Sequence, residues 1–211
     1  MTFFLHGLGH FHPENEITNA FLEELDIGTT ESWIMERVGI RSRRTTLPLD
    51  YIQATRNCDP RAAQEATLYT HAEAGRRAAE MALARAGLTA ADVGMVIAGS
   101  SVMDTATPAE ACNIARALGI EAPALDVNSA CTSFFAQLHI VSLMRPDALP
   151  PFVLLVVSEA VTRAVDYTDR SSAVLWGDAS VAAVVSTQVP GSTRAWRRGL
   201  VAHPSSNVVT P

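Results

Sequence analysis

One cysteine lies where a predicted strand gives way to a predicted helix. Residues 124–127 form a short apolar strand pattern, and a helix pattern starts near Cys131. The apolar side of that helix is expected to consist of Phe134, Phe135, Leu138 and Val141. The dipole and the free N–H groups of a helix N-terminus favour a thiolate and can bind an oxyanion. The pattern fits a nucleophile that attacks a thioester or other acyl group. It also fits a small buried cysteine on a core helix, which is what free cysteines usually are.

A second candidate site combines an aromatic ring with positive charge. Trp33 and Arg37 lie on a predicted helix that is capped by a threonine. Three arginines follow at positions 41, 43 and 44. Guanidinium groups beside an indole ring can hold a phosphate-bearing ligand whose base stacks on the ring. A solvated basic turn explains the same residues equally well.

Other spacings predict no metal site. Cys58, Cys112 and Cys131 are odd in number and not spaced like metal ligands. His10 and His12 lack a third ligand nearby, so a loop is the better interpretation. We expect no signal peptide and no membrane span, because no apolar run is long enough to cross a bilayer, and the expected location is the reducing cytoplasm.

The elements that must position these residues alternate along the chain. Strands are expected at residues 3–9, 93–98, 124–127, 152–157 and 180–186, with 173–176 as a further strand or bulge. Helices are expected at residues 19–25, 29–37, 61–86 and 107–118, and from Cys131 to Arg145, whereas residues 47–60 look irregular. Alternating strands and helices predict an α/β layered domain with a mixed sheet between helices, and the Cys131 helix should be central and buried.

Composition sets limits on the class of protein. The chain has 211 residues, of which 48% are hydrophobic, and a formal net charge of −6. A chain of this length can bury a real core as one large or two small domains. The negative charge argues against a nucleic-acid surface, which requires a clustered basic face.

Several motifs together resemble the β-ketoacyl-acyl carrier protein synthase III family of the thiolase superfamily. They occur in the family's order, at similar intervals, over nearly all of the chain. The matching segments are Trp33 with Arg37, residues 39–44, residues 107–112 with 118–120, residues 126–134, Asp169 with Arg170, and Gly177 with Asp178. The resemblance implies a thiolase-like αβαβα sandwich built from two similar halves, of which this chain is the first: residues 1–187 would be the N-terminal half-domain and residues 188–211 would begin the crossing segment.

The resemblance also assigns roles to individual residues. Cys131 matches the acyl-accepting nucleophile, and Trp33 matches the tryptophan that stacks on the adenine of coenzyme A. Arg37 and Arg170 match arginines around the same nucleotide, and Thr29 matches a nearby contact. Thr107 matches a residue that reaches across the dimer and bounds the acyl pocket. A small threonine there would leave room for a longer or branched acyl group.

Two departures from the family pattern matter. The usual Gly-Asp-Gly-Ala run reads Gly177-Asp178-Ala179-Ser180, so the tight backbone there is expected to differ. The family's catalytic His and Asn come from the C-terminal half, and no histidine of this chain stands in a matching context. These histidines are His6, His10, His12, His71, His139 and His203.

The resemblance therefore implies a condensing enzyme that needs a complement. An acyl group from acyl-CoA, used as substrate with no bound cofactor, would load onto Cys131 and condense with malonyl-carrier protein. Expected partners are acyl carrier protein, a C-terminal half or complementary subunit, and a second thiolase-like unit in a homodimer or heterodimer. Two alternatives remain open: an acyltransferase that forms an ester or amide, and a non-catalytic partner subunit, against which Cys131 argues.

Overall fold

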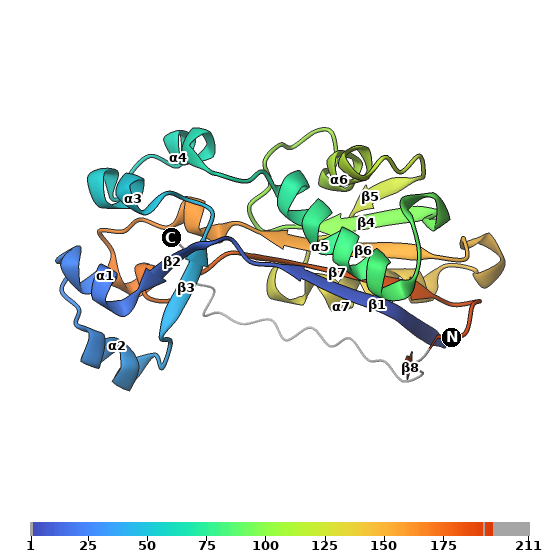
Figure 1. The fold of residues 1–211 in the computed structure, drawn as a ribbon, viewed down its shortest axis with the longest axis horizontal. Coiled ribbons are helices and arrows are strands. Elements are labelled where there is room, and N and C mark those ends of the chain that lie inside the picture. Colours follow the sequence, from blue (N-terminus) through green and yellow to red (C-terminus); the bar gives the residue numbers. More distant parts are fainter. Residues whose placement is uncertain (1, 192, 196–211) are drawn as a thin grey trace.

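The computed structural model describes residues 2–191 and 193–195, and a mixed sheet forms its centre (Figure 1). The strands are β1 (Phe3–Phe11), β2 (Asn15–Thr18), β3 (Ser42–Thr45), β4 (Met95–Gly99), β5 (Ala124–Asp126), β6 (Val153–Glu159), β7 (Ala179–Ser186) and β8 (Thr193–Ala195). The main sheet has the order β5-β4-β6-β7-β1-β8. Strands β5, β4 and β6 are parallel, whereas β7 is antiparallel to both β6 and β1. The predicted α/β class with a mixed sheet is confirmed.

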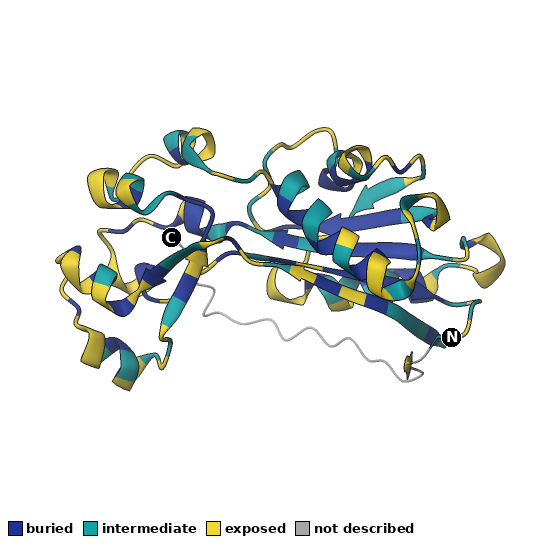
Figure 2. Ribbon diagram, in the orientation of Figure 1, coloured by how far each residue is buried: buried dark blue, intermediate teal, exposed yellow. Residues whose placement is uncertain are grey.

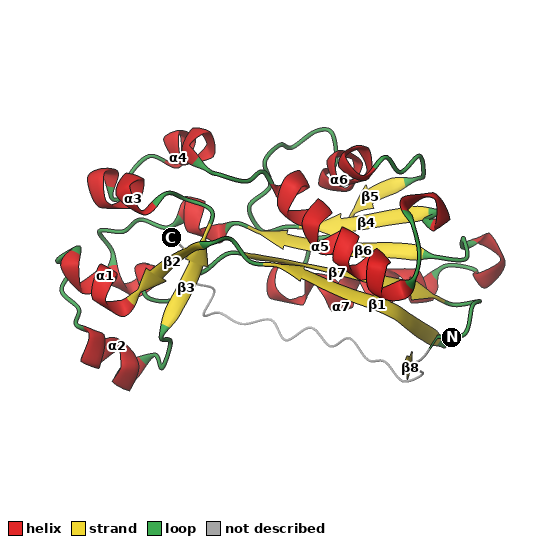
Figure 3. Ribbon diagram, in the orientation of Figure 1, coloured by secondary structure: helices red, strands yellow, loops and turns green. Residues whose placement is uncertain are grey.

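Helices cover both faces of this sheet (Figure 3). The helices are α1 (Asn19–Glu24), α2 (Glu31–Arg37), α3 (Leu49–Thr55), α4 (Pro60–Ala66), α5 (His71–Ala86), α6 (Glu110–Leu118), α7 (Ser133–Leu143) and α8 (Arg170–Ala173). Helices α5 and α6 share one buried apolar cluster with the sheet, and α7 packs against the opposite face. A Cβ at Gly9 would lie 2.0 Å from the carbonyl oxygen of Ala78, so α5 can lie this close to β1 only because the strand has glycine there.

A second core lies at one end of the sheet, where α1 to α4 surround the β2–β3 pair (Figure 1). The side chain of Asp178 connects this second core to the main sheet. Its buried carboxylate accepts hydrogen bonds from the backbone N–H groups of Thr46 and Thr162, and from the Thr46 hydroxyl. Burial raises the pKa of Asp178, and these hydrogen bonds act in the opposite direction. The motif at 177–180 is thus structural in this chain, and Ala179 is ordinary strand, paired with Glu159.

Helix α7 is apolar on all sides, but the sheet covers only one of them. Phe134, Leu138 and Val141 pack against the sheet. On the outer side, Phe135 and Leu143 are 64% and 63% exposed. Two expectations are therefore wrong for this chain: Phe135 does not belong to the packed side, and α7 is not buried between layers. The physical reason is that, among the described residues, no second sheet covers the outer side of α7. Buried residues are concentrated in the central strands of the main sheet (Figure 2).

Two predicted segments differ from the structure between residues 47 and 86. Residues 47–60 are not irregular, because α3 lies within them. The single helix predicted over 61–86 is divided into α4 and α5, and Thr70 caps the second of these by accepting a hydrogen bond from the backbone N–H of Glu73. The alanine-rich composition on both sides of this break favours helix and hides it from a pattern based on periodicity.

One predicted helix start and two predicted strands are also corrected. Helix α6 does not begin at Thr107, because residues 107–109 remain in the preceding loop. Its first N–H groups, those of Glu110 and Ala111, donate instead to the carboxylate of Asp126 at 2.8 Å each. Residues 173–176 are not a strand, because they contain the end of α8 and a turn. The strand predicted at 3–9 is correct but extends to Phe11.

In the part of the chain that the structure describes, no helix combines the length and the apolar character that crossing a membrane requires. The predicted crossing segment, residues 188–211, enters the described region only at its start, where β8 pairs with β1. Residues 196–211, including His203, lie outside the described residues.

Candidate active site

The turn that contains Cys131, residues 128–132, joins the end of β5 to the start of α7. Ala130 has a φ of +46°, in the left-handed region that residues other than glycine rarely adopt. Residues Ala130–Thr132 form one turn of 3-10 helix directly before α7, and Cys131 is exposed. The predicted position of the thiol at a strand-to-helix junction is confirmed, and the alternative of a buried core cysteine is excluded for this chain.

Two polar side chains hold this Cys131 turn in place. Asn128 Oδ1 accepts a hydrogen bond from the backbone N–H of Ala130 at 3.0 Å. Ser133 Oγ accepts one from the backbone N–H of Ser129 at 2.9 Å and donates to the carbonyl of Ala130 at 2.8 Å. A left-handed alanine costs of the order of 1–3 kcal/mol, and such conformations persist only where the surroundings fix them. The turn is thus strained, well anchored and open to solvent at its sulfur.

The sheet topology explains why this turn is a plausible place for chemistry. Strands β4, β5 and β6 are parallel neighbours, so their carboxyl ends lie at the same edge. The 100–109 loop follows β4, the Cys131 turn follows β5, and the 3-10 turn Val161–Ala164 follows β6. Ligands of open α/β sheets bind outside the carboxyl ends of the strands.

The predicted nucleotide residues form a second cluster. The Arg170 guanidinium carbon lies 4.9 Å from the centre of the Trp33 ring, and Arg170 Nη1 donates to the carbonyl of Gly28 at 2.6 Å. Thr29, the next residue, is buried, and its hydroxyl has no hydrogen-bond partner among the described residues. Arg37 is exposed and lies four residues after Trp33 in α2, which places both on one helix face. The structure therefore brings Trp33, Arg170 and Thr29 together, with Arg37 one turn along.

The basic segment at 41–44 is largely structural. Arg43 is buried and donates to the carbonyl of Val174 and to Asn19 Oδ1, and burial lowers the pKa of this guanidinium. Arg44 donates to the carbonyl of Glu14 at 2.8 Å. The hypothesis that three arginines here bind a phosphate is wrong for Arg43, whose donors are used within the fold, whereas Arg41 and Arg44 are both exposed.

Thr107 lies in the 100–109 loop and is exposed. The neighbouring Thr105 hydroxyl donates to the carbonyl of Pro108 at 3.3 Å, which closes the tip of the loop. Within the described residues, β5 is an edge strand of the sheet, so both this loop and β5 border on a face that another protein unit could cover.

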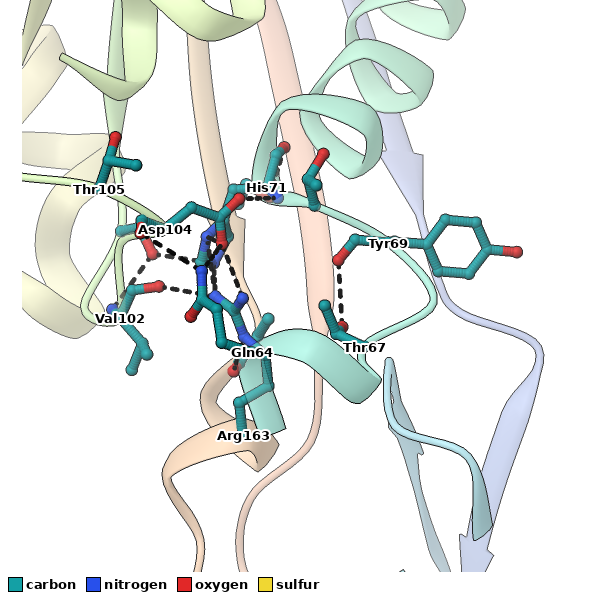
Figure 4. A network of polar contacts seen from close by, with 12 residues as sticks. Gln64, Thr67, Tyr69, His71, Val102, Asp104, Thr105 and Arg163 are labelled. Atoms are coloured by element: carbon teal, nitrogen blue, oxygen red, sulfur yellow. Dashed lines mark hydrogen bonds and ion pairs between the residues drawn. The ribbon is translucent and has the colours of Figure 1, made fainter. Parts of the chain in front are cut away.

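A buried polar cluster behind the 100–109 loop was not recognised from the sequence, which gave His71 no chemical role. Figure 4 shows Asp104 facing both His71 and Arg163. Asp104 Oδ1 lies 2.9 Å from His71 Nδ1 and accepts a hydrogen bond from Arg163 Nη1 at 2.7 Å. His71 and Arg163 are only 1% and 2% exposed. Asp104 and Arg163 follow neighbouring parallel strands, which is the one signal that could have revealed their contact.

The cluster also includes a carboxyl group that could suggest a metal site. His71, Asp104 and Glu110 offer donor atoms that all lie within 4.8 Å of one another. Imidazole and carboxylate ligands suit Zn²⁺. However, Arg163 already contacts Asp104 Oδ1, and its Nη2 lies 3.0 Å from His71 Nδ1. Because this guanidinium supplies the positive charge, a metal ion there would be repelled, and we interpret the cluster as an ion-pair network.

The two carboxyl groups of this network differ in their electrostatics. Burial alone would raise the pKa of Asp104, but the hydrogen bonds from His71 and the charge of Arg163 hold that pKa well below its ordinary value. Glu110 is 1% exposed, and neither of its carboxyl oxygens has a hydrogen-bond partner among the described residues. Burial therefore raises the pKa of Glu110.

Sequence comparisons give related proteins over most of the chain. The sequence profile of the family 3-oxoacyl-[acyl-carrier-protein (ACP)] synthase III matches residues 125–198. A β-ketoacyl-[acyl-carrier-protein] synthase III of Nitratidesulfovibrio vulgaris is 33% identical over 186 residues, which are 88% of this chain and 50% of the relative. The chain thus spans about half the length of the curated relatives it matches.

Structural comparisons agree with the sequence comparisons. The 3-oxoacyl-[acyl-carrier-protein] synthase III of Aquifex aeolicus VF5 superimposes with a TM-score of 0.74 at 28% identity, over 88% of this chain and 54% of that one. The priming β-ketosynthase of the R1128 polyketide biosynthetic pathway gives a TM-score of 0.68 at 31% identity, over 90% and 51%. The fold is therefore that of the N-terminal half of a thiolase-like protein.

The Glu110→Gln substitution should stabilise the protein in a pH-dependent way. Because the pKa of Glu110 is raised by folding, the folded state binds the proton more tightly than the unfolded state. The wild type therefore loses stability as the pH rises from 4.5, the ordinary pKa of a glutamate, through the raised pKa of the folded state. Glutamine does not ionise, so the Glu110→Gln variant lacks this loss. In urea denaturation at pH 8 the variant should be about 1–2 kcal/mol more stable than the wild type, and this difference should shrink towards pH 4.

The exposed Glu121→Gln variant is the matched control and should show no such pH dependence relative to the wild type. An equal stability of Glu110→Gln and wild type at every pH would mean that Glu110 is not buried in a charged form that opposes folding.

Proposed function

Because the chain belongs to the β-ketoacyl-acyl carrier protein synthase III family and spans its N-terminal half, we propose that it is the acyl-accepting half of a condensing enzyme. In this proposal an acyl group is transferred from acyl-CoA to Cys131. One observation carries it: the sulfur is exposed on an anchored, strained turn at the carboxyl edge of the sheet, immediately before α7. A cysteine retained only for packing would not need this geometry.

The proposed first step is an acyl exchange between two sulfurs. The Cys131 thiolate attacks the thioester carbonyl, a new C–S bond forms, and the bond to the coenzyme A sulfur breaks, so that the thiolate of coenzyme A leaves. Negative charge develops on the carbonyl oxygen between these events. The positive end of the α7 dipole directly follows the Cys131 turn and would favour that charge, although the N–H groups of Thr132 and Ser133 already donate to the carbonyls of Ser129 and Ala130.

The cluster of Trp33, Arg170 and Thr29 is the proposed nucleotide site. The indole ring offers a stacking face for adenine, and the guanidinium groups of Arg170 and Arg37 offer charge for phosphate. In the present structure Arg170 lies directly over the Trp33 ring, at a separation typical of a stacked pair. Binding would therefore require Arg170 to move away from the indole and close again on the nucleotide.

Condensation would need a complementary half. Decarboxylation of a malonyl group produces an enolate that must be stabilised, and family members use His and Asn side chains from the C-terminal half for that step. His139 cannot replace them, because it lies in α7, eight residues after Cys131, which corresponds to a rise of about 12 Å. The exposed outer side of α7 supports the same conclusion, since a helix that is apolar on all sides is suited to burial between two layers.

Acylation of Cys131 can be measured directly. Intact-mass spectrometry after incubation with an acyl-CoA should show one added acyl group on the wild type and none on Cys131→Ala. Cys58→Ala and Cys112→Ala keep the proposed nucleophile and are the matched controls, which should acylate like the wild type. Acylation of Cys131→Ala, or none of any variant when the complementary half is present, would contradict the proposal. Consumption of malonyl-carrier protein would then distinguish condensation from transfer to an alcohol or amine.

The residue at position 107 should set the preferred acyl length. The threonine is small, so we expect longer or branched acyl-CoA substrates to load at least as well as acetyl-CoA. Thr107→Phe should reverse this preference by filling the acyl pocket, whereas phenylalanine at the exposed neighbour Ala106 should leave it unchanged. A wild type that strongly prefers acetyl-CoA over a panel of acyl-CoA substrates would count against the role of Thr107.

A further inference from the structure

The Cys131 turn and the buried polar cluster both form polar contacts with the same residue, Ser100. Ser100 has no exposed surface and is the first residue after β4. Its backbone carbonyl accepts a hydrogen bond from Asn128 Nδ2 at 2.7 Å, and its hydroxyl lies 3.2 Å from His71 Nε2. Ser100 therefore connects the turn on one side with the cluster on the other.

Asn128 transmits this connection to the residue that precedes the thiol. Its side chain uses both ends: Nδ2 donates to Ser100, and Oδ1 accepts from the backbone N–H of Ala130 at 3.0 Å. Ala130 has the strained positive φ, and its backbone angles set the direction in which Cys131 leaves the turn. The amide of Asn128 is thus placed to hold the strained residue.

The orientation of the His71 ring is fixed by groups on its other side. Nδ1 faces Asp104 Oδ1 at 2.9 Å and Arg163 Nη2 at 3.0 Å, and the backbone N–H of His71 donates to Asp104 Oδ2 at 2.8 Å. Glu110 lies on the α6 side of the same cluster. Because Nδ1 is held by these charged groups, Nε2 faces the Ser100 hydroxyl at 3.2 Å, with Arg163 Nη2 3.4 Å from the same nitrogen.

We propose that His71, Ser100 and Asn128 form a positioning relay that fixes the Cys131 turn. None of them is expected to touch coenzyme A or the acyl group; they act through the backbone of Ala130. The relay also includes the 100–109 loop, since Asp104 and Ser100 belong to it. The loop that contains Thr107 and the turn that contains Cys131 are therefore held by the same buried residues. The proposal rests on the proposed function only in taking Cys131 as the reactive residue.

The test measures the alkylation rate of each cysteine with iodoacetamide, resolved by peptide mass spectrometry in the intact chain. Cys58 and Cys112 are also exposed and serve as internal controls for general loosening. Asn128→Asp keeps the acceptor for Ala130 but loses the donor to Ser100. His71→Gln preserves a polar group near Nε2, whereas His71→Asn preserves one near Nδ1 only. Ser129→Ala changes the same turn outside the relay and is the matched control.

The relay predicts a selective effect at Cys131. Asn128→Asp and His71→Asn should change its alkylation rate by about fivefold or more, with Cys58 and Cys112 within about twofold. His71→Gln and Ser129→Ala should stay near the wild type. In the Ser100→Ala background, His71→Asn should have no additional effect, because the link between His71 and the turn is already lost. A merely structural role of His71 would not give this dependence on Ser100.

The proposal is overturned if Cys131 reacts at the wild-type rate in all variants, if all three cysteines change together, or if the His71 and Ser100 effects simply add. If the His71 variants fail to fold, the alkylation rates of Asn128→Asp and Ser100→Ala still test the relay, since both substitutions are small. Acyl-CoA takes no part in this assay. A chain that shows the selective effect but is never acylated would therefore refute the proposed function and leave the relay intact.

Discussion

The parallel pairing of β4 with β5 and β6 is the constraint on which the proposed site depends. It brings three connections to one edge of the sheet, although they are far apart in the sequence: the 100–109 loop, the Cys131 turn and the turn Val161–Ala164. At that edge Asp104 and Arg163 form a largely buried ion pair, the Ser100 carbonyl accepts a hydrogen bond from the Asn128 side chain, and the thiol is exposed to solvent. The backbone hydrogen bonds of the sheet therefore determine where the Cys131 thiol lies, and the buried polar residues determine how its turn is held.

The second feature on which the proposed function depends is the uncovered side of α7. Phe135 and Leu143 are mostly exposed on a helix that is otherwise packed against the sheet. Burying one such side chain contributes about 1.5–3 kcal/mol, so this surface represents substantial unused stabilisation. The relatives are about twice as long as this chain. A complementary thiolase-like half covering α7 would use that stabilisation, and in the proposed function the same half would contribute the groups that the condensation step requires. In the proposed function, stability and chemistry would therefore both be served by one complementary half.

Local signals in the sequence were sufficient for the strand-to-helix junction at Cys131, because an apolar run, two polar residues and a helical period follow one another directly. The sequence also placed Trp33 and Arg170 in one site through a family resemblance, and the structure stacks them. The sequence could not predict contacts between residues that lie far apart along the chain. The cap of α6 comes from Asp126, sixteen residues later. Arg43 binds Val174, 131 residues away, and His71 meets Arg163, 92 residues away. Such pairs follow from the three-dimensional arrangement, and no periodicity within one segment encodes them.

The most direct measurement of the central claim is a crystal structure of the Cys131→Ala variant with bound acyl-CoA, in complex with its complementary half. The account predicts that the adenine ring lies between the Trp33 indole and the Arg170 guanidinium, with Arg170 displaced from its present stacked position. It also predicts that the thioester carbonyl lies next to Cβ of residue 131, close enough that a sulfur there would be at an attack distance of about 3–3.5 Å. A nucleotide bound elsewhere, or a thioester remote from residue 131 while Arg170 still covers Trp33, would contradict it.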